Sequence, residues 1–193
     1  MKIRTALLAL AGATLLSAPA FAQTSAWTID TAHSSVEFTI RHMGVSNVHG
    51  SLGGVKGTVL LDEKNLTKSS VEATIETKTV STGVDARDTH LKSPDFFDIA
   101  NNPTMSFKST GVTNAGGKLQ LVGLLTISGV TKPVTLDLDG PAPAQKGQGG
   151  KTISGFSASG VLHRTDFKFG PKFSAPILGD DVKFTIDIEM DKQ

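Results

Sequence analysis

Histidine is the side chain best suited to bind a transition metal or to transfer a proton near neutral pH, and this sequence contains five. A zinc-protease helix needs two histidines four residues apart with a glutamate beside the first, and no pair of histidines has that spacing. His33 and His42 are nine residues apart, on opposite faces of a strictly alternating strand. We therefore expect no metal site and interpret the histidines as polar surface and turn residues. They are His33, His42, His49, His90 and His163.

Two further stretches resemble functional motifs, and both are incomplete. The first, at residues 50–57, reads G-S-L-G-G-V-K-G; it lacks the Gly-Lys-Ser/Thr ending of a phosphate loop and leads into no helical pattern. The second, at residues 155–159, reads G-F-S-A-S; it lacks the last glycine of a nucleophile elbow. It also lies inside a strand pattern, where that motif needs a strand-to-helix turn. We predict that the protein is not an enzyme and needs no cofactor.

One stretch, residues 84–107, interrupts the strand pattern of the chain. Asp85 can cap a helix N-terminus by accepting backbone N–H bonds. Pro94 ends the helix, because the residue before a proline avoids helical angles. The phenylalanines at 96 and 97 follow as an apolar pair. We expect one short helix over about residues 85–92, followed by an aromatic plug that fills or covers one end of the fold.

The polar residues of this helix allow two interpretations. Arg87, Asp88 and His90 would contact the polar head group of a ligand if they lie over an open end of the fold. Alternatively they brace the helix locally, with Arg87 paired to Asp95 or Asp98. The sequence leaves both interpretations open.

Almost everywhere else apolar and polar residues alternate, which is the period of a strand with one wet face. The pattern repeats in about eight or nine segments, at the spacing of an all-β sandwich or barrel. Alternation favours antiparallel pairing, since buried parallel strands are apolar throughout. Closing the sheet removes exposed edges, so we favour a barrel. An eight-stranded barrel has an interior that side chains fill or that holds one small ligand.

The inward faces of these strands supply the candidate wall of the interior. Several faces carry a small residue between large ones, and small residues at one level would leave a channel, although a glycine can also serve only to bend a strand. Ala73 and Ala158 escape that objection and are expected to line a tunnel for an apolar chain. The candidate ligand-binding residues are Phe38, Ile40, Ala73, Ile75, Phe97, Phe107, Leu121, Gly123, Leu125, Phe156, Ala158, Phe184 and Ile186.

The first 22 residues have the composition of a cleavable signal peptide. Lys2 and Arg4 precede a short apolar run, and residues 20–22 read A-F-A, an A-x-A cleavage pattern. The run is too short for a membrane anchor, and residues 23–193 are expected to form one domain. Without the leader, acidic residues outnumber basic ones by one, which argues against nucleic acid as a partner. The chain has no cysteine, so no disulfide supports the core.

Five segments, in a fixed order along the chain, can be compared with known families. They are W-T-I-D-T-A-H-S-S-V-E-F-T-I-R-H from Trp27, R-D-T-H-L-K-S-P-D-F-F-D from Arg87, N-P-T-M-S-F from Asn102, L-T-I-S-G-V-T-K-P-V-T-L from Leu125 and H-R-T-D-F from His163. Together they resemble the YceI-like family, whose members are known as polyisoprenoid-binding periplasmic proteins. The resemblance extends over the whole length after the leader. Lys168 is one departure, because relatives are expected to have glycine after the Asp-Phe pair.

The resemblance implies an antiparallel, lipocalin-like barrel whose lumen takes a long isoprenoid, an isoprenoid quinone or a similar lipid. Its expected role is transport or storage of that lipid in the periplasm of a Gram-negative bacterium, with a homodimer as a further expectation. Two alternatives stay open: a structural or interaction barrel with a packed interior, and an enzyme acting on a lipid head group. The spacing of residues alone does not reach the ligand.

Overall fold

The structure, a computed structural model, describes residues 24–193, so the predicted signal peptide at 1–22 lies outside the described residues. Strands dominate, with one α-helix, α1 (Asp85–Leu91), and four short 3-10 helices. Among the described residues no helix is long and apolar enough to cross a membrane. The strands are β1 (Ser25–Ile29), β2 (Ser35–His42), β3 (Ser46–Leu52), β4 (Lys56–Leu61), β5 (Ser70–Glu76), β6 (Thr104–Ala115), β7 (Lys118–Ile127), β8 (Val130–Asp139), β9 (Gln145–Lys146), β10 (Thr152–His163) and β11 (Leu178–Lys192).

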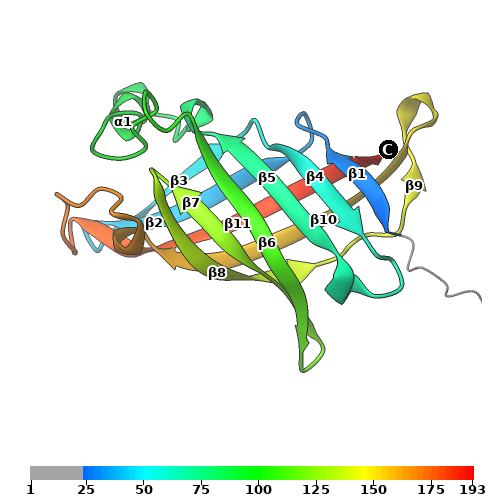
Figure 1. Cartoon of the computed structure of the whole chain (residues 1–193). Helices are drawn as coiled ribbons and strands as arrows, with labels where there is room; N and C mark the ends of the chain where they lie inside the picture. The colour runs from blue at the N-terminus through cyan, green and yellow to red at the C-terminus, as the bar shows by residue number, and fades with distance from the viewer. Residues whose placement is uncertain (1–23) are drawn as a thin grey trace, which may run out of the picture.

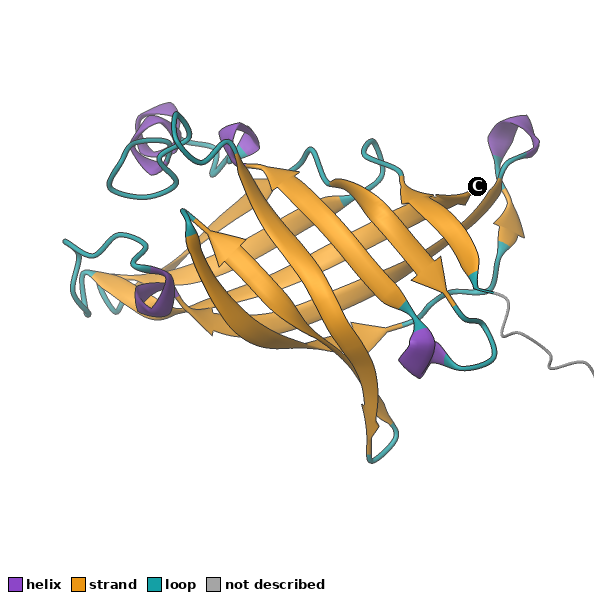
Figure 2. Ribbon diagram, viewed as in Figure 1, coloured by secondary structure: helices purple, strands orange, loops and turns teal. Residues whose placement is uncertain are grey.

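The strands form one antiparallel sheet that closes on itself (Figures 1 and 2). Its order is β3-β2-β11-β1-β4-β5-β6-β7-β8-β10-β9, and pairing of β10 with β11 completes the ring. The ring therefore contains eight strands, β11, β1, β4, β5, β6, β7, β8 and β10, with β2, β3 and β9 added. The predicted all-β antiparallel barrel of about eight strands with one short helix is confirmed.

The added strands β2 and β3 extend the barrel beyond β1 and β4. β1 and β2 pair with different parts of β11, around a break at residues 30–34. In the same way β4 pairs with β1 and β3 pairs with β2. The extension lies at the end of the barrel where Figure 1 shows α1, which we call the helix end; the C-terminus marks the terminal end. The helix end is thus a deeper cup than the eight-stranded ring alone would make.

The inward faces of the strands are packed differently at the two ends. Trp27 and Met190 are fully buried, and Val59 and Leu121 nearly so, which gives the terminal end a filled core. At the helix end the inward residues of β2 and β11, such as Phe38, are only half-buried. Half-buried apolar side chains on an inward face mean that the space in front of them is open.

The helix begins one residue earlier than a cap at Asp85 would imply. Val84 occupies the N-cap position, with no side-chain cap, and Asp85 is the first helical residue rather than the cap. Asp88, not Asp85, accepts hydrogen bonds near the start of the helix: its Oδ1 binds the backbone N–H and the hydroxyl of Thr82. A carboxylate in the first turn also complements the positive end of the helix dipole.

The turn at Lys168 forms despite the missing glycine. Lys168 has φ 55°, in the left-handed region, and its N–H bonds to Thr165 O at 3.0 Å. Left-handed angles favour glycine because it has no Cβ. Lysine therefore holds, with strain, a backbone geometry that glycine would adopt more easily.

Candidate functional site

A cavity of about 350 Å³ occupies the helix end of the barrel interior. Its wall comes from inward side chains of the barrel strands, from the helical insert and from the loop between β10 and β11. Apolar side chains make almost the whole surface. They are Val36, Phe38, Ile40, Val48, Leu52, Ile75, Leu91, Phe96, Phe97, Met105, Phe107, Leu125, Ile127, Val134, Leu136, Leu162, Phe167, Phe169, Phe173, Ile177, Leu178, Val182, Phe184 and Ile186.

Three phenylalanines of this wall lie across glycines on neighbouring strands. A Cβ built on Gly50 would lie 2.3 Å from Phe38 Cζ, and one on Gly123 would lie 2.4 Å from Phe107 Cζ. The third ring, of Phe184, would lie 3.1 Å from a Cβ on residue 160. These glycines therefore make room for rings that lie against the wall, which leaves the centre of the cup open.

Aromatic rings cover the cavity at the helix end. Phe97 and Phe169 meet edge to face with centroids 4.7 Å apart, and Phe96 stacks on Phe173 at 5.4 Å. The ring of His90 meets Phe96 edge to face at 5.1 Å. Phe96 and Phe97 come from the insert and the other two rings from the β10–β11 loop. The predicted aromatic plug is present, and it forms a cover over the cavity with two segments distant in sequence.

The β10–β11 loop is organised by the buried guanidinium of Arg164. Its N–H groups donate to five backbone carbonyls, three in the loop and two at the start of β11. Burial lowers the pKa of Arg164 from its ordinary value, while the charge of Asp180 opposes the shift. Arg164 reaches the cavity wall, but its five donors are already used, so its role is to hold the loop that carries Phe169 and Phe173.

The predicted polar cluster on α1 is a local brace at the cavity edge. Arg87 Nε donates to Thr82 Oγ1 at 2.7 Å, and Nη2 donates to Thr82 O at 3.0 Å. The expected pairing of Arg87 with Asp95 or Asp98 is wrong: Asp95 instead pairs with Lys172 at 2.6 Å. Arg87 binds Thr82 instead because Thr82 lies three residues before the start of the helix, within reach of a side chain in the first turn.

Arg87 and His90 line the cavity, and Asp88 does not. The other polar residues on the wall are His42, Thr82 and Arg164. All five carry N–H or O–H groups, although those of Arg164 are already bonded to backbone carbonyls, and among residues 24–193 no carboxylate lines the cavity. The edge of the cavity is therefore suited to a hydrogen-bond acceptor or an anion, not to an amine.

The structure separates the predicted ligand-binding residues into two groups. Ala73, Leu121, Gly123, Phe156 and Ala158 do not line the cavity, contrary to expectation. Ala158 is 2% exposed in the packed core, and Leu121 and Phe156 border a void of only about 30 Å³. The ring of Phe107 occupies the space beside Gly123. The cavity wall holds Phe38, Ile40, Ile75, Phe97, Phe107, Leu125, Phe184 and Ile186.

The wall also contains residues that sequence reasoning missed. Val134, Leu136, Leu162 and Val182 carried a signal, because each belongs to an inward face with the strand period. Arg164 had a weaker signal, since it stands in the H-R-T-D-F segment that marks the family. Nothing in the sequence indicated that its donors would turn inward toward loop carbonyls.

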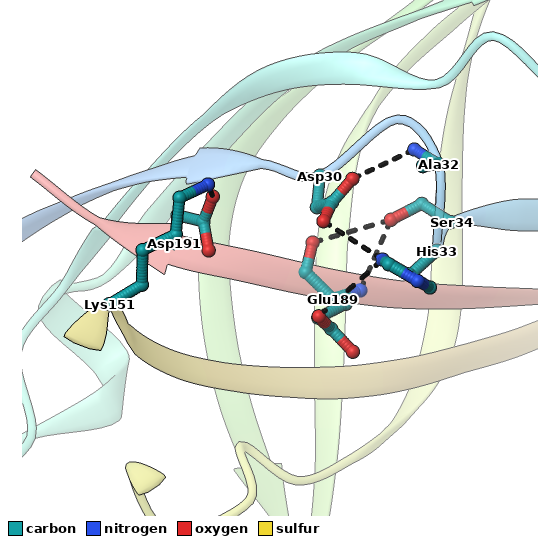
Figure 3. A network of polar contacts seen from close by, with 7 residues as sticks. All are labelled: Asp30, Ala32, His33, Ser34, Lys151, Glu189 and Asp191. Atoms are coloured by element: carbon teal, nitrogen blue, oxygen red, sulfur yellow. Dashed lines mark hydrogen bonds and ion pairs between the residues drawn. The ribbon is translucent and has the colours of Figure 1, made fainter. Parts of the chain in front are cut away.

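A separate polar network lies at the break between β1 and β2 (Figure 3). His33 Nδ1 lies 2.9 Å from Asp30 Oδ2 and 3.7 Å from Glu189 Oε1. The hydrogen bond to His33 is the main reason that the pKa of Asp30 is lowered, and the same bond raises the pKa of His33. Ser34 exchanges hydrogen bonds with the backbone of Glu189. The network therefore holds the segment between β1 and β2 against β11.

Three side chains of this network, Asp30, His33 and Glu189, are of types that can bind a metal ion. One nitrogen of His33 and one carboxylate oxygen each of Asp30 and Glu189 lie within 4.8 Å of one another. The Asp30–His33 hydrogen bond and the His33–Glu189 contact already account for this arrangement, and His33 is exposed on the surface. The expectation that the protein needs no metal stays a prediction.

A second hollow, of about 730 Å³, is open to solvent and lined mainly by polar residues, from β2, β3, β8, β10, β11 and the loop after β5. Its side chains include Glu37, His49, Asp137 and Lys183. Water is a better partner than an apolar molecule for such a surface. The deeper, apolar cavity at the helix end is therefore the better candidate for a binding site.

Comparison with known proteins identifies the fold family. The family model of the YceI-like domain matches residues 27–190. The chain belongs to the YceI-like family. Protein YceI of Salmonella arizonae is 40% identical over 135 residues, which cover 70% of each chain, and that of Salmonella enteritidis has the same identity and coverage.

Solved structures of YceI-like proteins share this barrel. The YceI protein of Campylobacter jejuni has 32% identity and a TM-score of 0.70, with 80% of this chain and 90% of that chain covered. BcnA of Burkholderia cenocepacia has 23% identity and a TM-score of 0.73, covering 83% and 98%. A polyisoprenoid-binding domain from Saccharophagus degradans has 12% identity and a TM-score of 0.64, covering 88% and 99%. The last two show the fold alone.

Proposed function

We propose that this YceI-like protein binds an apolar chain of the isoprenoid class in the cavity at the helix end of its barrel. The observation that carries the proposal is the cavity itself, a partly enclosed space with an almost entirely apolar wall. Such a surface gains little from holding water, whereas each methylene transferred to it from water contributes about 0.8 kcal/mol. The name of the Saccharophagus degradans domain, which shares the fold, supports the same ligand class.

The ligand enters with its apolar chain first and leaves its polar end at the cavity edge. The terminal end of the barrel is filled by Trp27 and Met190, so the chain cannot pass through. The polar side chains of the cavity wall include Arg87 and His90, which come from α1 at the covered end of the cavity. Because these groups donate hydrogen bonds, the favoured head group is a carbonyl, hydroxyl or anion. Asp88 braces Thr82 and takes no direct part.

The volume of the cavity limits how much of a chain it holds. Ligand cavities in proteins span roughly 300–1,000 Å³. At about 350 Å³ this cavity lies near the lower bound, so a long polyisoprenoid fits only in part unless the aromatic cover moves. The mobile part would be the rings of Phe96 and Phe173, which meet across two separate segments. A protein that holds its ligand only in part can take it up and release it. The proposed role is therefore transport or storage of the lipid in the periplasm, by a monomer or a homodimer.

A titration with prenyl alcohols of increasing chain length tests the proposal. Affinity should rise by up to about 0.8 kcal/mol for each buried methylene and then level off when the cavity is full. A plateau at short chains would show that the cover stays in place; continued gain would show that it opens. Absence of saturable binding at every length would leave the structural-barrel alternative in place.

A further inference from the structure

An apolar patch lies beside the cavity, on the turn between β2 and β3 and on the loop before β11. Met43 is 51% exposed, Val45 77% and Ile177 46%. The Met43 N–H donates to Ile177 O at 3.0 Å, so the turn and the loop are joined. Ile177 also lines the cavity, which makes the patch continuous with its wall. Pro176 is also exposed and lies beside Gly44 of the turn, so we call Met43, Val45, Pro176 and Ile177 the rim patch.

The turn that presents the rim patch uses a residue its backbone disfavours. Met43 has φ 52° and Gly44 has φ 71°, and Val45 N–H bonds to His42 O at 3.1 Å. Positive φ at both central residues of a hairpin turn favours Asn-Gly, because asparagine tolerates the left-handed region better than methionine. The chain instead holds a long apolar side chain there, exposed to solvent. A departure from local preference without gain in packing is typical of a functional surface.

The charged side chains beside the rim patch are held in place by hydrogen bonds and an ion pair. The Arg41 guanidinium donates to Gly44 O at 3.0 Å and to Asn47 Oδ1 at 3.2 Å. Both acceptors are neutral, so Arg41 keeps its positive charge. Lys172, on the same loop as Ile177, pairs with Asp95 at 2.6 Å, which offsets its charge. Apolar area beside a positive charge suits the interfacial region of a bilayer, where apolar side chains insert below the polar head groups.

The size of the patch distinguishes a bilayer from a second protein. A stable protein interface buries roughly 800 Å² on each partner. Four side chains at a turn and a loop do not supply that area. A bilayer accepts a few apolar side chains at its surface and sets no minimum interface.

We propose that the rim patch docks the barrel on a lipid bilayer, so that an apolar chain passes between the bilayer and the cavity without crossing water. The inference rests on the proposed binding of an apolar chain. Ile177 belongs both to the patch and to the cavity wall, so docking through the patch brings the cavity edge to the membrane surface.

The double variant Met43→Asn with Val45→Thr tests the docking. Asparagine suits the left-handed turn, and threonine has the shape of valine, so the fold should be kept. The control is Leu60→Thr, which removes a comparable exposed side chain, 44% exposed, from β4 at the terminal half of the barrel. Ligand-free proteins are sedimented with phosphatidylcholine vesicles, and transfer of a dansyl-labelled farnesol from those vesicles to the protein is timed.

We expect the double variant to lose roughly tenfold in vesicle affinity and to accept the probe more slowly by a similar factor. The control should match the wild type in both, and all three proteins should bind the probe equally at equilibrium. Equal vesicle affinity of wild type and double variant, or an equal loss in the control, would overturn the docking proposal. So would a wild-type dimer that the double variant converts to monomer without vesicle binding. Vesicle binding that depends on the patch, without binding of the probe in solution, would overturn the proposed function alone.

Discussion

The contrast between Val134 and Ala158 locates the empty part of the barrel. Val134, on β8, lines the cavity and is only half-buried, whereas Ala158, on β10, is 2% exposed and lies outside it. Ala158 faces Leu138 and Ile186 on its two neighbouring strands. A larger side chain at each position meets opposite conditions: free volume at one and close packing at the other.

The expected magnitudes differ in both stability and binding. Val134→Phe adds four carbons, and each methylene-sized group removed from water contributes up to roughly 0.8 kcal/mol, offset by about 1 kcal/mol of lost side-chain freedom. The free energy of unfolding should thus stay the same or rise slightly. The ring displaces about four methylenes of a ligand, which is about 3 kcal/mol and more than a hundredfold in Kd. Ala158→Phe should lower stability by about 1–3 kcal/mol through overpacking.

Urea unfolding of the ligand-free proteins and titration with a prenyl alcohol measure the two effects. Leu162→Phe, at a second cavity position, serves as a replicate should the ring at 134 disturb Phe107. The reasoning is refuted if Val134→Phe and Leu162→Phe both destabilise as much as Ala158→Phe. It is equally refuted if both are stable and bind the prenyl alcohol with unchanged affinity.

Three further changes test separate parts of the structure. Lys168→Gly should raise stability by up to about 1 kcal/mol because it relieves a left-handed lysine, while Lys168→Ala, which keeps the strain, should not; equal melting temperatures for glycine and alanine would contradict this. His33→Gln should lower the melting temperature between about pH 4 and pH 6.5 and less at higher pH. The raised pKa of His33 gives stability that is full below its ordinary pKa and is lost as pH rises through the raised one. The lowered pKa of Asp30 gives stability that is lost on the acid side; a pH-independent difference would contradict the pairing. Phe97→Ala should cost about 3–5 kcal/mol and speed ligand release, and unchanged melting and release would show that the cover is idle.

The alternation of apolar and polar residues predicted the barrel, because a one-sided strand must bury one face whatever its partners are. The same alternation could not assign depth. Phe156 and Phe184 both face inward, yet only Phe184 lines the cavity, since depth follows from register across strands that are distant in sequence. Gly123 looked like a gap, and the ring of Phe107 from the neighbouring strand occupies it. Glycines such as Gly123 therefore lie where an aromatic ring packs against the wall, whereas half-buried large residues line the open cavity.

The short segments were harder to predict for a related reason. Arg164 is an ordinary charged residue in sequence, and its burial depends on five carbonyls that converge only when the β10–β11 loop folds beside the start of β11. The break between β1 and β2 depends likewise on Glu189, which follows it by more than 150 residues. Family resemblance could identify these segments, while the reason for their composition needed the tertiary contacts.

Mass spectrometry of lipids carried by the protein tests the central claim most directly. The wild type and Val134→Phe are purified from the same cells without detergent, and each is extracted with organic solvent. An isoprenoid-class lipid in near-stoichiometric amount in the wild type, and strongly depleted in Val134→Phe, is the predicted result. A wild-type protein that carries no apolar lipid, or equal amounts of the same lipid in both proteins, would contradict a lipid-binding cavity at the helix end of this barrel.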